Sequence, residues 1–225
     1  MNSIRRRASR SATAVPTRVA IIDTGVNPWH SHVGGGVQGC RIFLDSSGSI
    51  REDDDFRDLA GHGTAVAGIL RNSLPGVEIY AVRAFERDFR SYPSLVARAI
   101  LRAAAEGCTV LNLSLGMTPG PGCEQLVAAC RSALAAGCTL VAAGLPGHPD
   151  LLPAAIPGVL SVVADDRVPD GSVSLNTAGN YNYCASGRPR ELGGLPAAGN
   201  LWGNSFACAR VSAHLVGQRE GAGKP

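Results

Sequence analysis

Three residues have side chains that could take part in catalysis, and each lies at a turn or at the start of a helical pattern, where its side chain would be accessible. Asp23 ends an apolar run at residues 19–22 and opens a turn that contains glycine. His62 lies between two glycines where an apolar helical pattern begins, and Ser205 follows a Gly-Asn turn and enters a run of small residues. A carboxylate, an imidazole and a hydroxyl are the parts of a nucleophile activated by a general base. These residues are therefore the candidate catalytic group.

Each of these segments has a simpler interpretation when it is taken alone. Asp23-Thr24-Gly25 also resembles the active-site loop of aspartic proteases, but those enzymes need a second carboxylate and Asp-Thr-Gly occurs once here. His62 could simply start a helix, and Ser205 could be an ordinary N-cap serine. The case for chemistry rests on acid, base and nucleophile each having a separate and structurally sensible position.

Short β-branched runs alternate with amphipathic stretches along the chain, which predicts helices packed on a parallel sheet. The predicted strands cover residues 18–23, 77–83, 108–114, 138–143 and 159–163. Apolar stripes that begin at Leu95 and Leu126 predict two covering helices, and each ends in a glycine that suits a left-handed cap. The predicted fold class is α/β, with a doubly wound, mostly parallel sheet flanked by helices.

One domain is expected at residues 18–217, and composition limits what it binds. Residues 1–17 are rich in Arg and Ser without periodicity, which indicates a disordered lead-in, and residues 218–225 are expected to form a flexible tail. A net charge of +3, from 21 basic and 18 acidic residues, gives no electrostatic case for a nucleic-acid partner.

The lack of a recognisable targeting signal and the odd number of cysteines favour a cytoplasmic protein. The N-terminal arginines are followed by no signal-peptide core, and no apolar run approaches the roughly 18 residues of a membrane helix. The seven cysteines are an odd number in a chain large enough to fold without disulfides. We therefore expect reduced thiols, a cytoplasmic location and no membrane partner.

The three candidates occur in the chain order Asp, His, Ser, which is the order in subtilisin. Asp-Thr-Gly after a buried strand, Gly-His-Gly-Thr-x-Val-Ala-Gly-Ile from Gly61 and Gly-x-Ser-x-Ala from Gly203 resemble the three active-site motifs of the subtilase family. Residues 110–116 resemble the family's substrate-pairing strand, and residues 153–162 resemble a later strand entry. The likeness runs from about Arg18 to Gly217.

This resemblance implies a serine endopeptidase that acts on a peptide or protein substrate without a cofactor. Ser205 would attack the peptide carbonyl, His62 would transfer the proton, and Asp23 would orient the imidazole. The residues implied to pair with the substrate and to wall its pocket are Ser114, Leu115, Gly116, Ala142, Ala143 and Gly144.

One departure from the family pattern bears on turnover. The family places an oxyanion-binding Asn after the Gly that corresponds to Gly144, and this chain has Leu145 there. Loss of that donor costs roughly 10²–10³ in turnover in subtilisin. The sequence therefore leaves two functions open, a slow or dedicated processing protease and a pseudoprotease that binds peptides.

Other candidates have weaker patterns. His30 and His32 could place two metal ligands on one strand face, but no third ligand is evident, so no metal is expected. The acidic run at residues 53–55 lacks the spacing of a calcium loop. Cys208 is interpreted as a packing residue, with a redox-sensitive thiol as the alternative.

Overall fold

The structure is a computed structural model, and it describes residues 17–176 and 180–222. Its centre is a nine-stranded sheet in the order β3-β2-β4-β1-β5-β6-β7-β9-β8. Only the pairs β2–β3 and β8–β9 are antiparallel among the described strand pairs. The strands are β1 (Arg18–Asp23), β2 (Val37–Leu44), β3 (Ile50–Asp53), β4 (Glu78–Arg83), β5 (Val110–Leu113), β6 (Thr139–Ala143), β7 (Leu160–Ala164), β8 (Val173–Leu175) and β9 (Tyr183–Ala185).

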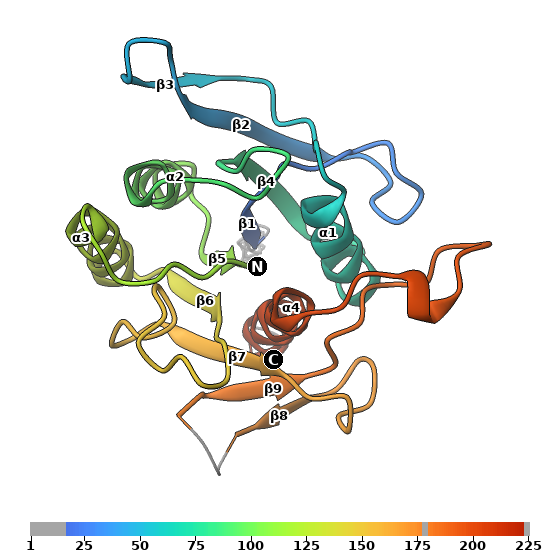
Figure 1. The fold of residues 1–225 in the computed structure, drawn as a ribbon. Coiled ribbons are helices and arrows are strands. Elements are labelled where there is room, and N and C mark those ends of the chain that lie inside the picture. Colours follow the sequence, from blue (N-terminus) through green and yellow to red (C-terminus); the bar gives the residue numbers. More distant parts are fainter. Residues whose placement is uncertain (1–16, 177–179, 223–225) are drawn as a thin grey trace, which may run out of the picture.

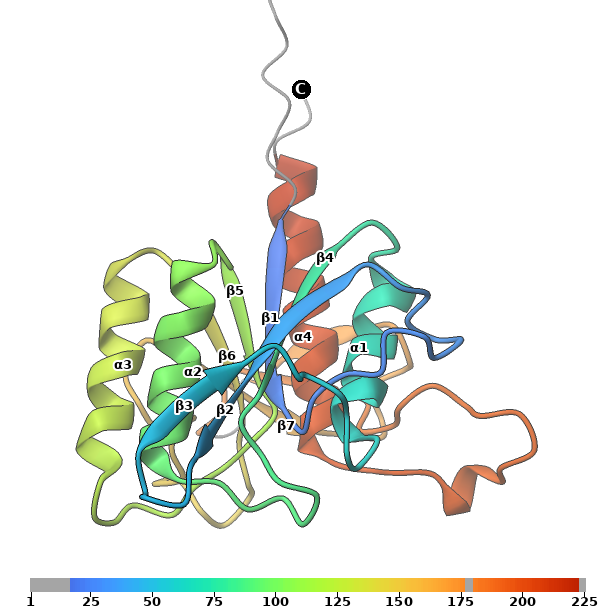
Figure 2. The ribbon, with the colours of Figure 1, turned by 90° about the horizontal axis from the view of Figure 1, so that it is seen from above.

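Helices cover both faces of this sheet, as Figure 1 and Figure 2 show. Helices α2 (Pro93–Ala105) and α3 (Cys123–Ala135) lie on one face, and α1 (His62–Ser73) and α4 (Asn204–Ala222) lie on the other. A single turn of 3₁₀ helix, η1, spans Ala197–Gly199. The predicted α/β class with a doubly wound, mostly parallel sheet is confirmed.

The central strand β1 shows why these strands are continuously apolar. Ala20 and Ile22 pack into the layer of α2 and α3, whereas Val19 and Ile21 pack into the layer of α1 and α4. Because both faces of a parallel strand are covered, every residue must be compatible with burial. The five predicted strands correspond to β1, β4, β5, β6 and β7, within two residues at each boundary.

The two glycines predicted to end helices do so. Gly107 has a φ of 77° after α2, and Gly137 has a φ of 86° after α3. This left-handed conformation costs glycine nothing, because it has no Cβ. Each glycine turns the chain from a helix into the next strand of the sheet.

The predicted chain ends are only partly described. Residues 1–16, which make up almost all of the expected lead-in, and residues 223–225 of the expected tail lie outside the described residues. Helix α4 continues to Ala222, so the first part of the segment expected as a tail is helical. Within the described residues, no helix is both long and apolar enough to span a membrane.

The topology brings the candidate residues to one edge of the sheet. Asp23 is the last residue of β1, Ser114 follows β5, and Gly144 follows β6. Ligands of open parallel sheets bind outside the carboxyl ends of the strands. The start of β1 and the end of α4 lie at the opposite end of the molecule (Figure 2).

Candidate active site

The acid and the base of the candidate group are in direct contact. Asp23 is 4% exposed at the end of β1, and its Oδ1 is 2.7 Å from Nδ1 of His62, the first residue of α1. The same oxygen accepts a hydrogen bond from the backbone N–H of Thr24 at 2.7 Å. Because Nδ1 faces the carboxylate, Nε2 is the ring nitrogen left for a second partner.

This contact depends on a close approach of α1 to the end of β1. A Cβ added to Gly63 would be 2.0 Å from the carbonyl oxygen of Gly25 and 3.1 Å from Cβ of Asp23. Any side chain at residue 63 would therefore push the helix away from the strand. Glycine after His62 lets the imidazole reach the buried carboxylate.

The electrostatic setting of His62 favours the protonated imidazole. Burial would lower the pKa of His62, but the charge of Asp23, its hydrogen bond and the charge of Asp58 outweigh burial and raise the pKa above its ordinary value. A general base must be neutral before it accepts a proton. Activity that depends on His62 should therefore rise with pH, and the midpoint of this rise should lie above the ordinary histidine pKa of about 6.5.

The candidate nucleophile lies at the start of α4, where a chain of hydrogen bonds holds the backbone. Ser205 Oγ donates to the carbonyl oxygen of Ser114 at 3.1 Å, and Ser114 Oγ donates back to the carbonyl oxygen of Ser205 at 2.9 Å. Asn112 donates to Ser114 Oγ at 2.8 Å, and Ser212 donates to Asn112 at 3.0 Å. This buried polar chain ties α4 to the end of β5.

All three candidate residues open on one cleft. Asp23, His62 and Ser205 line a cavity of about 200 Å³. Three of the predicted substrate-binding residues, Ser114, Leu115 and Gly116, line the same cavity. The ring of Phe206, which follows Ser205, lies 5.3 Å from the His62 ring between centroids.

Comparison with known proteins identifies the family of the chain. The model of a family described as the subtilase family matches residues 16–218. The chain belongs to the subtilase family.

Two curated relatives show the extent of the likeness. This subtilase is 35% identical over 161 residues to a thermostable alkaline protease of Halalkalibacterium halodurans, an alignment that covers 67% of this chain and 42% of that protein. It is 32% identical over 170 residues to subtilisin BL of Lederbergia lenta, covering 71% of this chain and 59% of that protein. The chain thus spans about half the length of the curated relatives it matches.

Solved structures share the fold. A cold adapted subtilisin-like serine proteinase matches with a TM-score of 0.70 at 22% identity, covering 91% of this chain and 76% of that chain. A protease from Pseudoalteromonas arctica matches with a TM-score of 0.71 at 20% identity, covering 89% of this chain and 76% of that chain. The subtilase fold is therefore shown by structure as well as by sequence.

The other predicted substrate-binding residues lie on the neighbouring strand. Ala142 and Ala143 are the last residues of β6, and Gly144 follows them and donates to the carbonyl oxygen of Val162 at 2.7 Å. They are not among the residues that line the cavity of Asp23, His62 and Ser205. Their role as the second wall of the substrate pocket stays a prediction.

Two side chains of this subtilase crowd the predicted pocket walls. A Cβ on Gly116 would be 2.3 Å from a methyl carbon of Leu151, and a Cβ on Gly144 would be 2.5 Å from the ring of Tyr181. Leu151 and Tyr181 therefore pack directly against these glycines. Sequence reasoning missed both residues, since neither belongs to a motif.

Leu145 lies two residues after the end of β6 and is 41% exposed. Its carbonyl oxygen accepts hydrogen bonds from the Tyr181 hydroxyl at 2.5 Å and from the backbone N–H of His148 at 2.9 Å. The backbone is thus held from two sides, while the leucine side chain has no polar atom to offer.

Phe89 is a further residue of the cleft that the sequence did not indicate. Phe89 has a φ of 63°, and in the described part of the chain it is the only residue other than glycine with a positive φ. Phe89 is 52% exposed and lines the cleft, and its ring lies edge-on to His62 with centroids 5.6 Å apart. A bulky residue rarely adopts this conformation, and here it places the Phe89 side chain beside His62.

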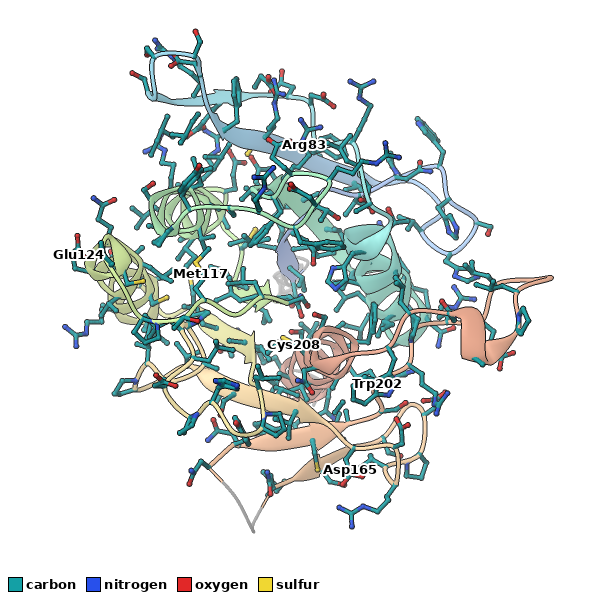
Figure 3. All side chains as sticks on the ribbon, in the orientation of Figure 1. Arg83, Met117, Glu124, Asp165, Trp202 and Cys208 are labelled. Atoms are coloured by element: carbon teal, nitrogen blue, oxygen red, sulfur yellow. The ribbon has the colours of Figure 1, made fainter. Side chains whose placement is uncertain are left out.

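The structure also gives the surroundings of the histidine pair and the acidic run that the sequence analysis set aside. The rings of His30 and His32 are 5.0 Å apart, and no group of three His, Cys, Asp or Glu that could hold a metal exists among residues 17–176 and 180–222. Asp53 pairs with Arg41, and Asp55 pairs with Arg83 at 3.3 Å. Arg83, which is labelled in Figure 3, is the last residue of β4.

Cys208 is a packing residue of α4, labelled in Figure 3. Its thiol is fully buried and lies 3.3 Å from the carbonyl oxygen of Val141. Burial raises the pKa of Cys208 to about 12. Since thiolates are the reactive form, this thiol is poorly suited to redox sensing.

Proposed function

We propose that this subtilase is a serine endopeptidase that hydrolyses peptide bonds through an acyl-enzyme. The observation that carries the proposal is the 2.7 Å contact between Asp23 and His62 in the same cleft as Ser205. An acid, an imidazole and a serine at the start of a helix form the group that activates a hydroxyl nucleophile.

The first half of the reaction forms the acyl-enzyme. The Ser205 hydroxyl turns from the Ser114 carbonyl toward Nε2 of His62 and attacks the peptide carbonyl as the imidazole takes its proton. Asp23 holds the imidazole in the tautomer with its proton on Nδ1 and stabilises the positive charge that develops. Collapse of the tetrahedral intermediate breaks the C–N bond, and His62 gives the proton to the leaving amine.

The second half returns the enzyme to its starting state. Water attacks the ester carbonyl while His62 takes one of its protons, and the proton then returns to Ser205 as the acid product leaves. The backbone N–H of Ser205, in the first turn of α4, has no acceptor within the helix and supports the oxyanion. The dipole of α4 adds to this stabilisation.

The proposed substrate is an extended peptide that pairs with residues 114–116. This segment lies between the end of β5 and Met117, which bridges to Leu152. Its backbone groups would hydrogen-bond the substrate as an added strand. Leu151 and Tyr181 narrow the space beside Gly116 and Gly144, which favours a small residue before the cleaved bond.

Leu145 favours a second candidate, a pseudoprotease that binds peptides without cleaving them. A leucine cannot donate the second hydrogen bond that stabilises an oxyanion. Retention of the acid, base and nucleophile in one cleft supports the enzyme instead, with turnover that is slow or limited to a dedicated substrate. Binding and orientation of such a substrate can compensate for a weak oxyanion site.

Hydrolysis of a fluorogenic peptide library separates the two functions. The parent should cleave, and Ser205→Ala should lose roughly 10³-fold or more of that turnover while the fold is kept. Ser132→Ala, which removes a hydroxyl from the exposed face of α3, is the matched control and should cleave like the parent. A parent that binds peptides but shows no turnover above that of Ser205→Ala would establish the pseudoprotease.

A further inference from the structure

Asp58, four residues before His62, accepts an unusual number of hydrogen bonds. Its Oδ1 accepts from the backbone N–H of Ala60 at 2.9 Å, the backbone N–H of Gly61 at 2.8 Å and the hydroxyl of Thr24 at 2.8 Å. Its Oδ2 accepts from the backbone N–H of Thr64 at 2.8 Å and from the Thr64 hydroxyl. Five donors therefore converge on one carboxylate beside the catalytic group.

These donors come from both sides of the Asp23–His62 pair. Thr24 follows the acid directly, and Thr64 lies two residues after the base. The Thr24 hydroxyl oxygen is 2.8 Å from Oδ1 of Asp58 and 3.2 Å from Oδ1 of Asp23, so the shorter of its two contacts is with Asp58. Asp58 thus connects the end of β1 to the first turn of α1 through hydrogen bonds.

Asp58 also supplies the side-chain acceptor that the N-terminus of α1 lacks. The N-cap residue Gly61 makes no side-chain cap hydrogen bond, and the backbone N–H groups of the first helical turn have no acceptor within the helix. The carboxylate of Asp58 takes the N–H of Thr64, as an N-cap side chain would. A negative charge at this helix end is favoured by the helix dipole as well.

The carboxylate is charged under the conditions in which a protease works. Burial would raise the pKa of Asp58, but the hydrogen bonds from Thr64, Ala60 and Thr24 outweigh burial and hold the pKa below its ordinary value. In the described part of the chain, the charged groups that act on His62 are Asp23 from β1 and Asp58 from the loop before α1. The 84–92 loop and α4 present the uncharged rings of Phe89 and Phe206.

We propose that Asp58 is a positioning residue for His62, which holds the first turn of α1 against the Asp23–Thr24 turn so that the imidazole stays aligned. It touches neither the substrate nor the reacting atoms in this role. The proposal deepens the proposed function and rests on it for its catalytic consequence. The effect of Asp58 on the pKa and alignment of His62 can be measured without turnover.

The direct test is a titration of His62 by NMR in the parent and in Asp58→Asn. His62→Gln assigns the His62 signal, and Asp54→Asn is the matched control, since it removes an exposed carboxylate from the same loop. Asp58→Asn should lower the pKa of His62 by roughly 0.5 unit or more, because one nearby negative charge is lost. It should also weaken the downfield signal of the proton shared between His62 and Asp23. Asp54→Asn should change neither.

Kinetics give the catalytic part of the test. Asp58→Asn should lower kcat by about tenfold or more with little change in KM, and move the acid limb of the pH profile to lower pH. If the parent has no turnover, the proposed function fails, while the NMR titration still decides the role of Asp58. An unchanged His62 pKa and shared-proton signal in folded Asp58→Asn would overturn the inference.

A second variant covers the case in which Asp58→Asn does not fold. Thr24→Val removes the hydroxyl through which Asp58 reaches the acid turn, and Thr24→Ser restores it. Thr24→Val should weaken the shared-proton signal and lower kcat, and Thr24→Ser should recover both. If the two variants have the same shared-proton signal and the same kcat, the proposed connection through Asp58 and Thr24 is contradicted.

Discussion

Asp23 and His62 are joined by a 2.7 Å contact, whereas the Ser205 hydroxyl donates to the backbone carbonyl of Ser114 at 3.1 Å. The proposed reaction therefore begins with rotation of one small side chain about a single bond. The backbone of Ser205 needs no rearrangement, since the hydrogen bond from Ser114 already holds it.

Leu145 is the residue at which the proposed turnover can be improved. Leu145→Asn should raise kcat by up to roughly 10²-fold, or about 2.7 kcal/mol of transition-state stabilisation, because the new amide would donate to the oxyanion. KM should stay close to that of the parent, since the donor strengthens as charge develops. Steady-state cleavage of one peptide measures both constants.

The control for this variant is Leu175→Asn, which places the same change on an exposed leucine of β8. It should leave kcat unchanged. Turnover of folded Leu145→Asn at or below that of the parent would mean that another donor already serves the oxyanion, or that residue 145 points elsewhere.

At the scale of elements, the contact between β1 and α1 decides whether the base meets the acid. Gly63 lies against the turn that follows β1, with space for a hydrogen but not for a methyl group. The loop from β3 to α1 holds the helix from the other side through Asp58.

Gly63→Ala tests this element contact. The added methyl group would be 2.0 Å from the Gly25 carbonyl oxygen, so α1 must move outward, and we expect a loss of about 1–3 kcal/mol of stability. Turnover should fall by roughly 10²-fold, since a displacement of about 1 Å is enough to misalign a catalytic group. Thermal unfolding and peptide cleavage measure the two effects.

Gly76→Ala is the matched control, because a Cβ there would meet no atom within 4 Å. It should keep both stability and turnover. If Gly63→Ala unfolds at the parent's temperature and cleaves at the parent's rate, the close approach has no role in aligning the site.

The elements also show what a sequence can and cannot predict. The five central strands were predictable because burial on both faces makes them continuously apolar. β3 and β8 were not, since their residues are exposed or half-buried and follow no clear alternation. β2 and β9, which pair with these outer strands, were missed as well.

The candidate site was predictable where its residues form contiguous motifs. Asp23, His62 and Ser205 each lie in such a motif, and the structure brings them to one cleft. Asp58 was not predictable, because its importance comes from donors that meet only in three dimensions. Phe89 and Leu151 were missed for the same reason, since their contacts are made across the fold.

At the scale of the whole molecule, the sheet assembles the site from distant parts of the chain. The proposed acid comes from β1, the proposed base from α1 and the proposed nucleophile from α4, with α1 and α4 packed on the same face (Figure 1). The carboxyl ends of β1 and β5 place these parts side by side. A reactive Ser205 would therefore report on the complete fold as well as on the chemistry.

The most direct test of the central claim is to locate the adduct of a fluorophosphonate probe by mass spectrometry. The probe reacts with serines that a neighbouring base activates, so a single adduct on Ser205 is expected in the folded parent. Ser205→Ala should form none, and His62→Ala should form it far more slowly. A folded parent that remains unlabelled, or that carries the adduct on another residue, would contradict the account of Ser205 as the activated nucleophile.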